Sequence, residues 1–153
     1  MRGPALAISL LALPAVLAGC LATEAPKVNK TLRSVPLTST SDLEAYDIAD
    51  AVDDQLRAWC AAALLVREEG EPLAVDDPIV DGRAAEQVER LRAAAEVAEG
   101  EELAASLVAF TLAQEERLAV LAKGPKFAAK RYLKADRKVA ELAFGLRRWR
   151  LQR

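Results

Sequence analysis

The chain has 153 residues and a net charge of −2, which fits one domain or one domain with a processed leader. Hydrophobic residues make up 52 % of the chain, but 32 of them are alanines and aromatic residues are only 5 %, a composition that favours helix. The balanced charge argues against a fully disordered chain or a basic nucleic-acid coat. The sequence contains no histidine, which removes most nucleophile–base pairs and most zinc or haem sites.

The first twenty residues carry the strongest motif. Arg2 is a minimal positive start, and residues 5–16 form a mainly apolar run. This run is shorter than the ~20 residues that a membrane-spanning helix needs, so it is typical of a secretory leader. It is followed directly by Leu17, Ala18, Gly19 and Cys20.

This tetrapeptide resembles the lipobox of bacterial lipoproteins, with Leu17, Ala18 and Gly19 at the positions that the signal peptidase recognises. The resemblance covers residues 1–20 only. It implies that residues 1–19 are a signal peptide and that Cys20 receives a diacylglyceryl thioether. The alternative is an ordinary signal peptide followed by a coincidental cysteine.

Leu21 follows the cysteine, where lipoproteins kept at the inner membrane tend to carry Asp. The resemblance therefore implies an outer-membrane anchor facing the periplasm.

Residues 21–40 contain two prolines, several Ser and Thr residues and no helical or strand period. We expect residues 20–40 to be a lipidated cysteine and a flexible tether, which would span ~25 Å as a coil. An ordered arm packed on the domain is the alternative.

A helix is predicted over about residues 42–69. Ser41 and Glu44 have the spacing of a capping box, and Gly70 and Pro72 end the helix. One apolar stripe runs along it at steps of four and three: Ala45, Ala49, Val52, Leu56, Trp59, Ala63 and Val66.

The irregular segment 71–82 contains three aspartates and Gly82, which raises the question of a calcium loop. The spacing does not match that of a calcium-binding loop with its distal glutamate. We therefore expect a solvated loop in which Asp81 caps the next helix.

Two further helices are predicted over about 83–98 and 101–122. Gly100 alone does not separate them, because one glycine inside a helix costs only ~1 kcal/mol. The apolar stripe, however, rotates by ~100° at this point, which favours a break over one helix of about forty residues. The stripes consist of Ala84, Val88, Leu91, Ala95 and Ala98, and then Leu103, Leu107, Phe110, Leu118 and Leu121.

Gly124 and Pro125 end the third helix, and Pro125 suits the first position of a fourth. Its stripe contains Ala128, Tyr132, Ala135, Val139, Leu142, Leu146 and Trp149. We therefore predict an all-α domain over residues 41–153, a small antiparallel bundle of three to four helices with a thin, alanine-rich core. A hairpin around one long middle helix is the alternative.

Charge is divided sharply along the domain. Residues 41–120 hold twenty acidic side chains and six arginines, a net of −14, whereas residues 123–153 hold eleven basic and two acidic side chains, a net of +9. Three interpretations stay open: pairing within the bundle, binding to an anionic polymer or membrane surface, or a helix-in-groove contact with another envelope protein. The candidate anion-binding residues are Lys126, Lys130, Arg131, Lys134, Arg137, Lys138, Arg147, Arg148 and Arg150.

Cys60 lies in the apolar part of the first helix, so we expect a small core residue, with an intermolecular disulfide as the alternative.

Without histidine, and with glutamate pairs that are adjacent rather than facing, the sequence predicts no catalytic residue, cofactor or metal site. We expect a lipid-anchored envelope protein that acts as a structural or adaptor binding module. Its partners would be the membrane and another envelope protein, or a second copy, and not nucleic acid. The alternative function is polyanion or membrane-surface binding through the basic helix.

Overall fold

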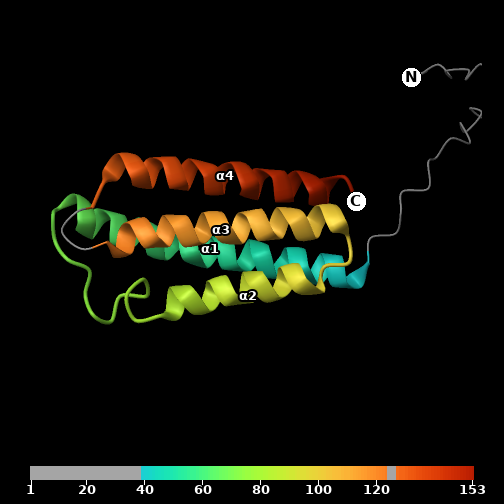
Figure 1. Ribbon diagram of the computed structural model, residues 1–153, viewed down its shortest axis with the longest axis horizontal. Coiled ribbons are helices and arrows are strands. Elements are labelled where there is room, and N and C mark those ends of the chain that lie inside the picture. Colours follow the sequence, from blue (N-terminus) through green and yellow to red (C-terminus); the bar gives the residue numbers. More distant parts are fainter. Residues whose placement is uncertain (1–38, 124–126) are drawn as a thin grey trace, which may run out of the picture. The chain divides into compact units, whose positions relative to one another are not determined.

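The computed structural model describes residues 39–123 and 127–153, and these residues form helices, turns and loops without a strand. The helices are α1 (Thr40–Glu68), α2 (Arg83–Val97), α3 (Glu101–Ala122) and α4 (Ala129–Leu151). Successive helices run in opposite directions, which gives an antiparallel four-helix bundle (Figure 1). The predicted all-α bundle is confirmed, and its four helices are separate.

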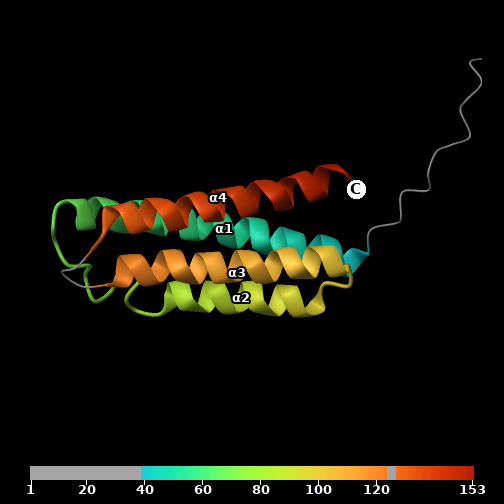
Figure 2. The same ribbon diagram turned by 45° about the horizontal axis from the view of Figure 1, so that its top comes forward.

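Helix α3 is the central element of the bundle. It packs extensively against both α2 and α4, which make no contact with each other in the described part of the chain, and α1 contacts all three. Both views show α2 and α4 on either side of α3, with α1 packed along the bundle (Figures 1 and 2). This arrangement leaves α2 and α4 with broad outward surfaces.

The core is narrow and rich in alanine, as the sequence predicts. Leu56, Leu91, Leu103 and Leu107 are fully buried at the centre, and each contributes ~1.5–3 kcal/mol by burial. Small side chains at the remaining seam positions allow the helices to approach closely. These buried alanines are Ala45, Ala49, Ala63, Ala84, Ala94, Ala95, Ala113, Ala135 and Ala143.

The predicted break near Gly100 is confirmed, and Asp42 explains it. Oδ1 of Asp42 accepts hydrogen bonds from the backbone N–H groups of Glu99, at 2.8 Å, and Gly100, at 3.0 Å. A Cβ atom on Gly100 would lie only 2.9 Å from Oδ2 of Asp42. The first turn of α1 therefore caps the N-terminus of α3, which has no cap of its own.

The C-terminal end of α3 is held by Arg67 near the end of α1. Nε and Nη2 of Arg67 donate to the carbonyl of Leu121, at 3.0 and 2.9 Å, and Nη2 also donates to that of Lys123, at 2.7 Å. An anion at the start of a helix and a cation at its end both complement the helix dipole. Side chains of α1 thus fix α3 at both ends.

Helix α1 begins two residues earlier than predicted, and the predicted capping box is wrong. Ser39 is the N-cap, and its Oγ accepts from the backbone N–H of Asp42 at 3.0 Å. Ser41 instead donates to Oε1 of Glu99 at 3.2 Å, and Glu44 is exposed. The earlier start frees Ser41 and Asp42 to hold the turn between α2 and α3.

Near the C-terminal end of α1, some buried residues lie one position later than the predicted apolar stripe. Trp59 and Val66 are only half-buried, and Cys60 and Arg67 are buried instead. A strict seven-residue pattern drifts by ~20° per repeat on a straight helix. The predicted stripe is therefore correct up to Leu56 and at Ala63, and one residue early at Trp59 and Val66.

The predicted start of α2 at residue 83 is confirmed, but its cap differs, and the start of α4 differs as well. Gly82, in a left-handed conformation with φ of +98°, is the N-cap of α2. Asp81 still accepts from the backbone N–H of Arg83 at 3.0 Å. Helix α4 begins only at Ala129, so Pro125 is not its first residue. Phe127 precedes the helix and packs against Tyr132, with 6.4 Å between ring centroids.

Candidate binding surfaces

The predicted lipobox residues Leu17, Ala18, Gly19 and Cys20, and the predicted basic residue Lys126, lie outside the described residues. The other predicted anion-binding residues all lie on α4 and are exposed. They are Lys130, Arg131, Lys134, Arg137, Lys138, Arg147, Arg148 and Arg150. Some of these side chains point towards neighbouring helices, and others point away from the bundle.

The basic residues at the sides of α4 pair with neighbouring helices. Nζ of Lys138 lies 3.4 Å from Oε2 of Glu116 on α3. Arg147 lies 3.5 Å from a carboxylate oxygen of Asp50 and 3.6 Å from one of Asp53, both on α1. Pairing within the bundle therefore accounts for the sides of the basic helix.

The surface of α4 that points away from the bundle has a different character, and we call it the α4 outer face. Leu133 and Phe144 are 62 % and 65 % exposed there, although both are large and apolar. The four cations around them form no ion pair with a described residue. The α4 outer face consists of Lys130, Leu133, Lys134, Arg137, Phe144 and Arg148, together with the exposed acidic residue Glu141.

A hollow of about 350 Å³ lies beside this face, between α3 and α4. Lys123, Arg131 and Lys134 line it, together with Glu116. Three cations around one concave surface give it a positive field. This hollow adds Lys123 to the predicted set of basic residues.

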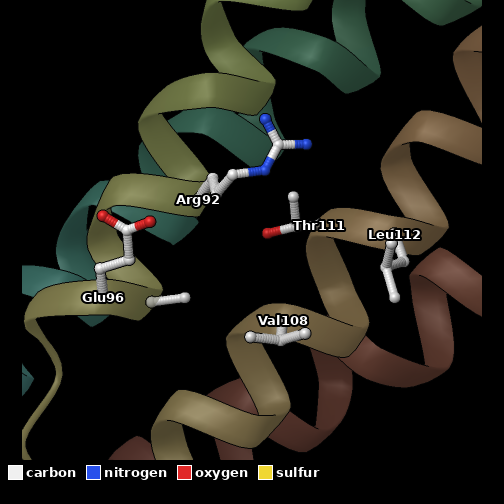
Figure 3. A pocket seen from close by; sticks show the side chains of 6 residues that line it. Arg92, Glu96, Val108, Thr111 and Leu112 are labelled. Carbon is white, nitrogen blue, oxygen red and sulfur yellow. The ribbon is translucent and has the colours of Figure 1, made fainter.

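On the other side of α3, an apolar groove runs between α2 and α3 (Figure 3). Its volume is about 290 Å³, and Ala95, Val108, Thr111 and Leu112 form its apolar walls. Val108 and Leu112 are 51 % and 56 % exposed. The apolar spacing of the third helix predicts only its core stripe and does not predict this surface. The signal in the sequence was the presence of large apolar residues, Val108 and Leu112, between the core positions of this helix.

A chain of polar side chains crosses the bundle interior from α1 through α3 to α4. Gln114 Nε2 donates to Oδ1 of Asp53 at 3.0 Å, and Gln114 Oε1 accepts from Nη2 of Arg117 at 2.6 Å. Nη1 of Arg117 then donates to Oδ1 of Asp136 at 3.0 Å. Asp53 also pairs with Arg57 on the surface. We call Asp53, Gln114, Arg117 and Asp136 the polar chain.

The polar chain is buried, since Asp53, Gln114 and Arg117 are at most 2 % exposed. Among the described side chains, Nε of Arg117 is the buried polar atom without a hydrogen-bond partner. Residue type alone does not predict that Gln114 and Arg117 are buried, because Gln and Arg are usually exposed. The spacing could have found them, because Gln114 and Arg117 continue the core steps from Phe110 to Leu121.

Cys60 is buried beside the polar chain, as predicted for a core residue. Burial raises the pKa of its thiol to about 11, although Arg117 acts in the opposite direction. Burial also raises the pKa of the Tyr132 hydroxyl to about 12. Both groups are therefore protonated at neutral pH, which makes Cys60 a poor nucleophile.

Within residues 39–123 and 127–153, no group of three or more His, Cys, Asp or Glu side chains is arranged to hold a metal ion. None of the helices there is both long and apolar enough to cross a bilayer. The fold and its surfaces define a four-helix bundle with a polar interior chain and two exposed apolar surfaces of different charge. Comparison with family models, curated proteins and solved structures gave no match to this chain.

Proposed function

We propose that this chain is a lipid-anchored, non-catalytic protein of the cell envelope that acts as a structural or adaptor binding module. The lipobox-like sequence at residues 17–20 supports the anchor, and Leu21 after the cysteine supports the outer-membrane location. The observation that carries the binding role is the exposure of large apolar side chains on the α4 outer face and at the α2/α3 groove. Exposed apolar surface that the bundle does not need for its own packing is typical of interaction sites.

In this proposal, lipid on Cys20 anchors the chain, and the tether predicted within residues 21–40 gives the bundle reach. Each buried CH₂ of an acyl chain contributes ~0.8 kcal/mol, so two or three chains hold the protein firmly at the membrane. Anchoring also raises the local concentration of the bundle near its partners, so that modest surfaces suffice for binding.

Labelling with palmitate tests the anchor. We expect label and membrane association in the wild-type protein and loss of both in a Cys20→Ser variant. Cys60→Ser is the matched control, because Cys60 is buried in α1 and should leave labelling unchanged. Undiminished labelling of Cys20→Ser would contradict the proposed anchor.

Binding of α4 to an anionic polymer or lipid surface is the second candidate function. The cationic hollow lined by Lys123, Arg131 and Lys134 is the observation that favours it. Such binding weakens steeply as ionic strength rises. The unlipidated protein would bind vesicles containing anionic lipid in dilute buffer and leave them in salt.

Two neighbouring charge reversals test this candidate in one helix. Arg137→Glu changes a cation of the α4 outer face, whereas Lys138→Glu changes one that already pairs with Glu116. Surface binding predicts a larger loss of vesicle affinity for Arg137→Glu. Equal affinity of both variants and the wild-type protein would exclude this second candidate.

A further inference from the structure

The α2/α3 groove is longer than one hollow. A second hollow of about 240 Å³ lies further along the same seam, with Ala84, Val88, Leu118 and Ala119 among its lining residues. Arg92 and Glu115 meet between the two hollows. Together the hollows give the seam a shallow apolar surface along most of α2, which is suited to another helix.

The rim of this groove is acidic. Glu96 borders the first hollow, and Glu89 and Glu115 border the second. Arg92 is the cation among these lining residues, and it is already bound to both Glu89 and Glu115. Figure 3 shows Arg92 and Glu96 projecting from α2 on one side, and Val108 and Leu112 from α3 on the other. The groove therefore suits an apolar helix face that carries positive charge.

The α4 outer face has these complementary properties. Leu133 and Phe144 are eleven residues apart, which places them on one side of a helix. Arg137 lies between them, and Lys130 and Arg148 flank them. These cations have no acidic partner among the described residues, so a groove with an acidic rim can supply one.

The two surfaces cannot meet within one chain. Helices α2 and α4 lie on either side of α3 and do not touch each other in the described residues (Figure 1). We propose that the α4 outer face of one copy docks into the α2/α3 groove of a second copy. This inference rests on the structural binding role proposed above and names a second copy of the chain as its partner.

The contact joins two different surfaces, so it is heterologous. After the first contact, one copy keeps an unused groove and the other copy keeps an unused α4 outer face, so association can continue into a row. Anchored copies would form such rows along the membrane. Charged groups on both sides make the association weaker at high ionic strength.

Sedimentation of the chain from residue 20 onwards, carrying Cys20→Ser to remove the lipid, tests the proposal. We expect oligomers that grow with concentration and dissociate in salt. Leu112→Gln removes apolar surface from the groove, and Phe144→Asp places an anion on the α4 outer face. Each variant should associate at least about tenfold more weakly than the wild-type chain. Leu65→Gln is the control, because Leu65 is 64 % exposed on α1 and belongs to neither surface.

Mixing the two variants gives the decisive result. Leu112→Gln keeps its α4 outer face and Phe144→Asp keeps its groove, so an equimolar mixture should form a one-to-one dimer that stops growing. All three positions are more than half exposed, and circular dichroism will show that the variants fold. A monomeric wild-type chain, or a mixture that does not associate, would overturn the proposal. Either result leaves the Cys20 anchor unaffected, and loss of that anchor leaves this contact unaffected.

Discussion

The seam between α2 and α3 and the seam between α1 and α4 differ in their polar content. Ala84, Val88, Leu91 and Ala95 of α2 are buried, so apolar side chains bring α2 and α3 together. Between α1 and α4, Tyr46 stacks on Trp149, Arg147 reaches Asp50 and Asp53 across the surface, and the polar chain crosses the interior through α3. The apolar seam between α2 and α3 depends mainly on packing volume, whereas the seam between α1 and α4 also depends on matched donors and acceptors.

The two seams also differ in what they offer to a binding partner. Asp53, Gln114 and Arg117 of the polar chain are enclosed and bonded within the bundle, so they are not available to a partner. The apolar seam leaves Val108 and Leu112 exposed on its outer side. We therefore place the binding role on the outward surfaces and assign the buried charges to the choice of helix arrangement, as a hypothesis for this bundle.

The largest effect should come from the apolar seam. Leu91 of α2 is fully buried, and Leu91→Ala should lower the free energy of unfolding by ~2–5 kcal/mol because it removes contacts and leaves a cavity. Val97→Ala is the control, since Val97 is 57 % exposed on the same helix. Urea denaturation measures both. Equal destabilisation by the two variants would show that α2 does not form the seam described.

The next effect should come from the polar chain. Asp53→Ala leaves the Nε2 donor of buried Gln114 without its acceptor, and an unsatisfied buried group costs ~1–3 kcal/mol. Asp54 is adjacent and exposed, so Asp54→Ala should change stability little. If Asp53→Ala is no less stable than Asp54→Ala, the polar chain does not hold α1 to α3.

A smaller effect is expected from the cap that α1 supplies to α3. Asp42→Ala leaves the backbone N–H groups of Glu99 and Gly100 without their acceptor, and loss of an N-cap costs ~0.5–2 kcal/mol. Asp42→Asn keeps an acceptor oxygen and should restore part of the stability. Hydrogen exchange at the start of α3 will report the opening of this end. Unchanged exchange in Asp42→Ala would contradict the cap.

The smallest effect concerns alkaline pH. The pKa of Cys60 rises from 9.0 in the unfolded chain to about 11 in the folded one, so the folded state holds the thiol proton more tightly. Its stabilising contribution is complete below pH 9 and is lost as the pH rises towards 11. At about pH 9.5 the loss should be below ~1 kcal/mol.

Thermal unfolding across this range, with wild-type protein and Cys60→Ala, measures the effect. The variant should lose stability less steeply between pH 9 and 10, and any steeper loss towards pH 12 reflects Tyr132. Parallel curves for the two proteins would contradict a buried, protonated Cys60.

Local patterns predicted the helices well, and long-range contacts explain where they failed. Apolar spacing predicted the bounds of α3 and the break at Gly100, because both depend on periodicity along one helix. Helix α1 starts at its local cap Ser39, whereas Ser41 and Asp42 reach the turn between α2 and α3 through long-range contacts that no local pattern reveals. The start of α4 depends on Phe127 packing against Tyr132.

The candidate surfaces were predicted in part for the same reason. The basic helix was visible as a run of charge, but which cations pair depends on the acids of α1 and α3 that face them. Lys138 and Arg147 have such partners, and Arg137 does not. The groove between α2 and α3 was not predicted, because it exists only once two helices pack side by side.

Site-specific crosslinking of the lipidated protein in intact envelopes tests most directly the claim that the bundle works through its outward surfaces. A photoreactive amino acid would replace Leu112 in the groove, Phe144 on the α4 outer face, or Leu65 on α1 as the control. We predict adducts from the first two positions, with position 112 linked to α4 of a second copy, and little from position 65. Equal adducts at all three positions, or none at positions 112 and 144, would contradict the claim.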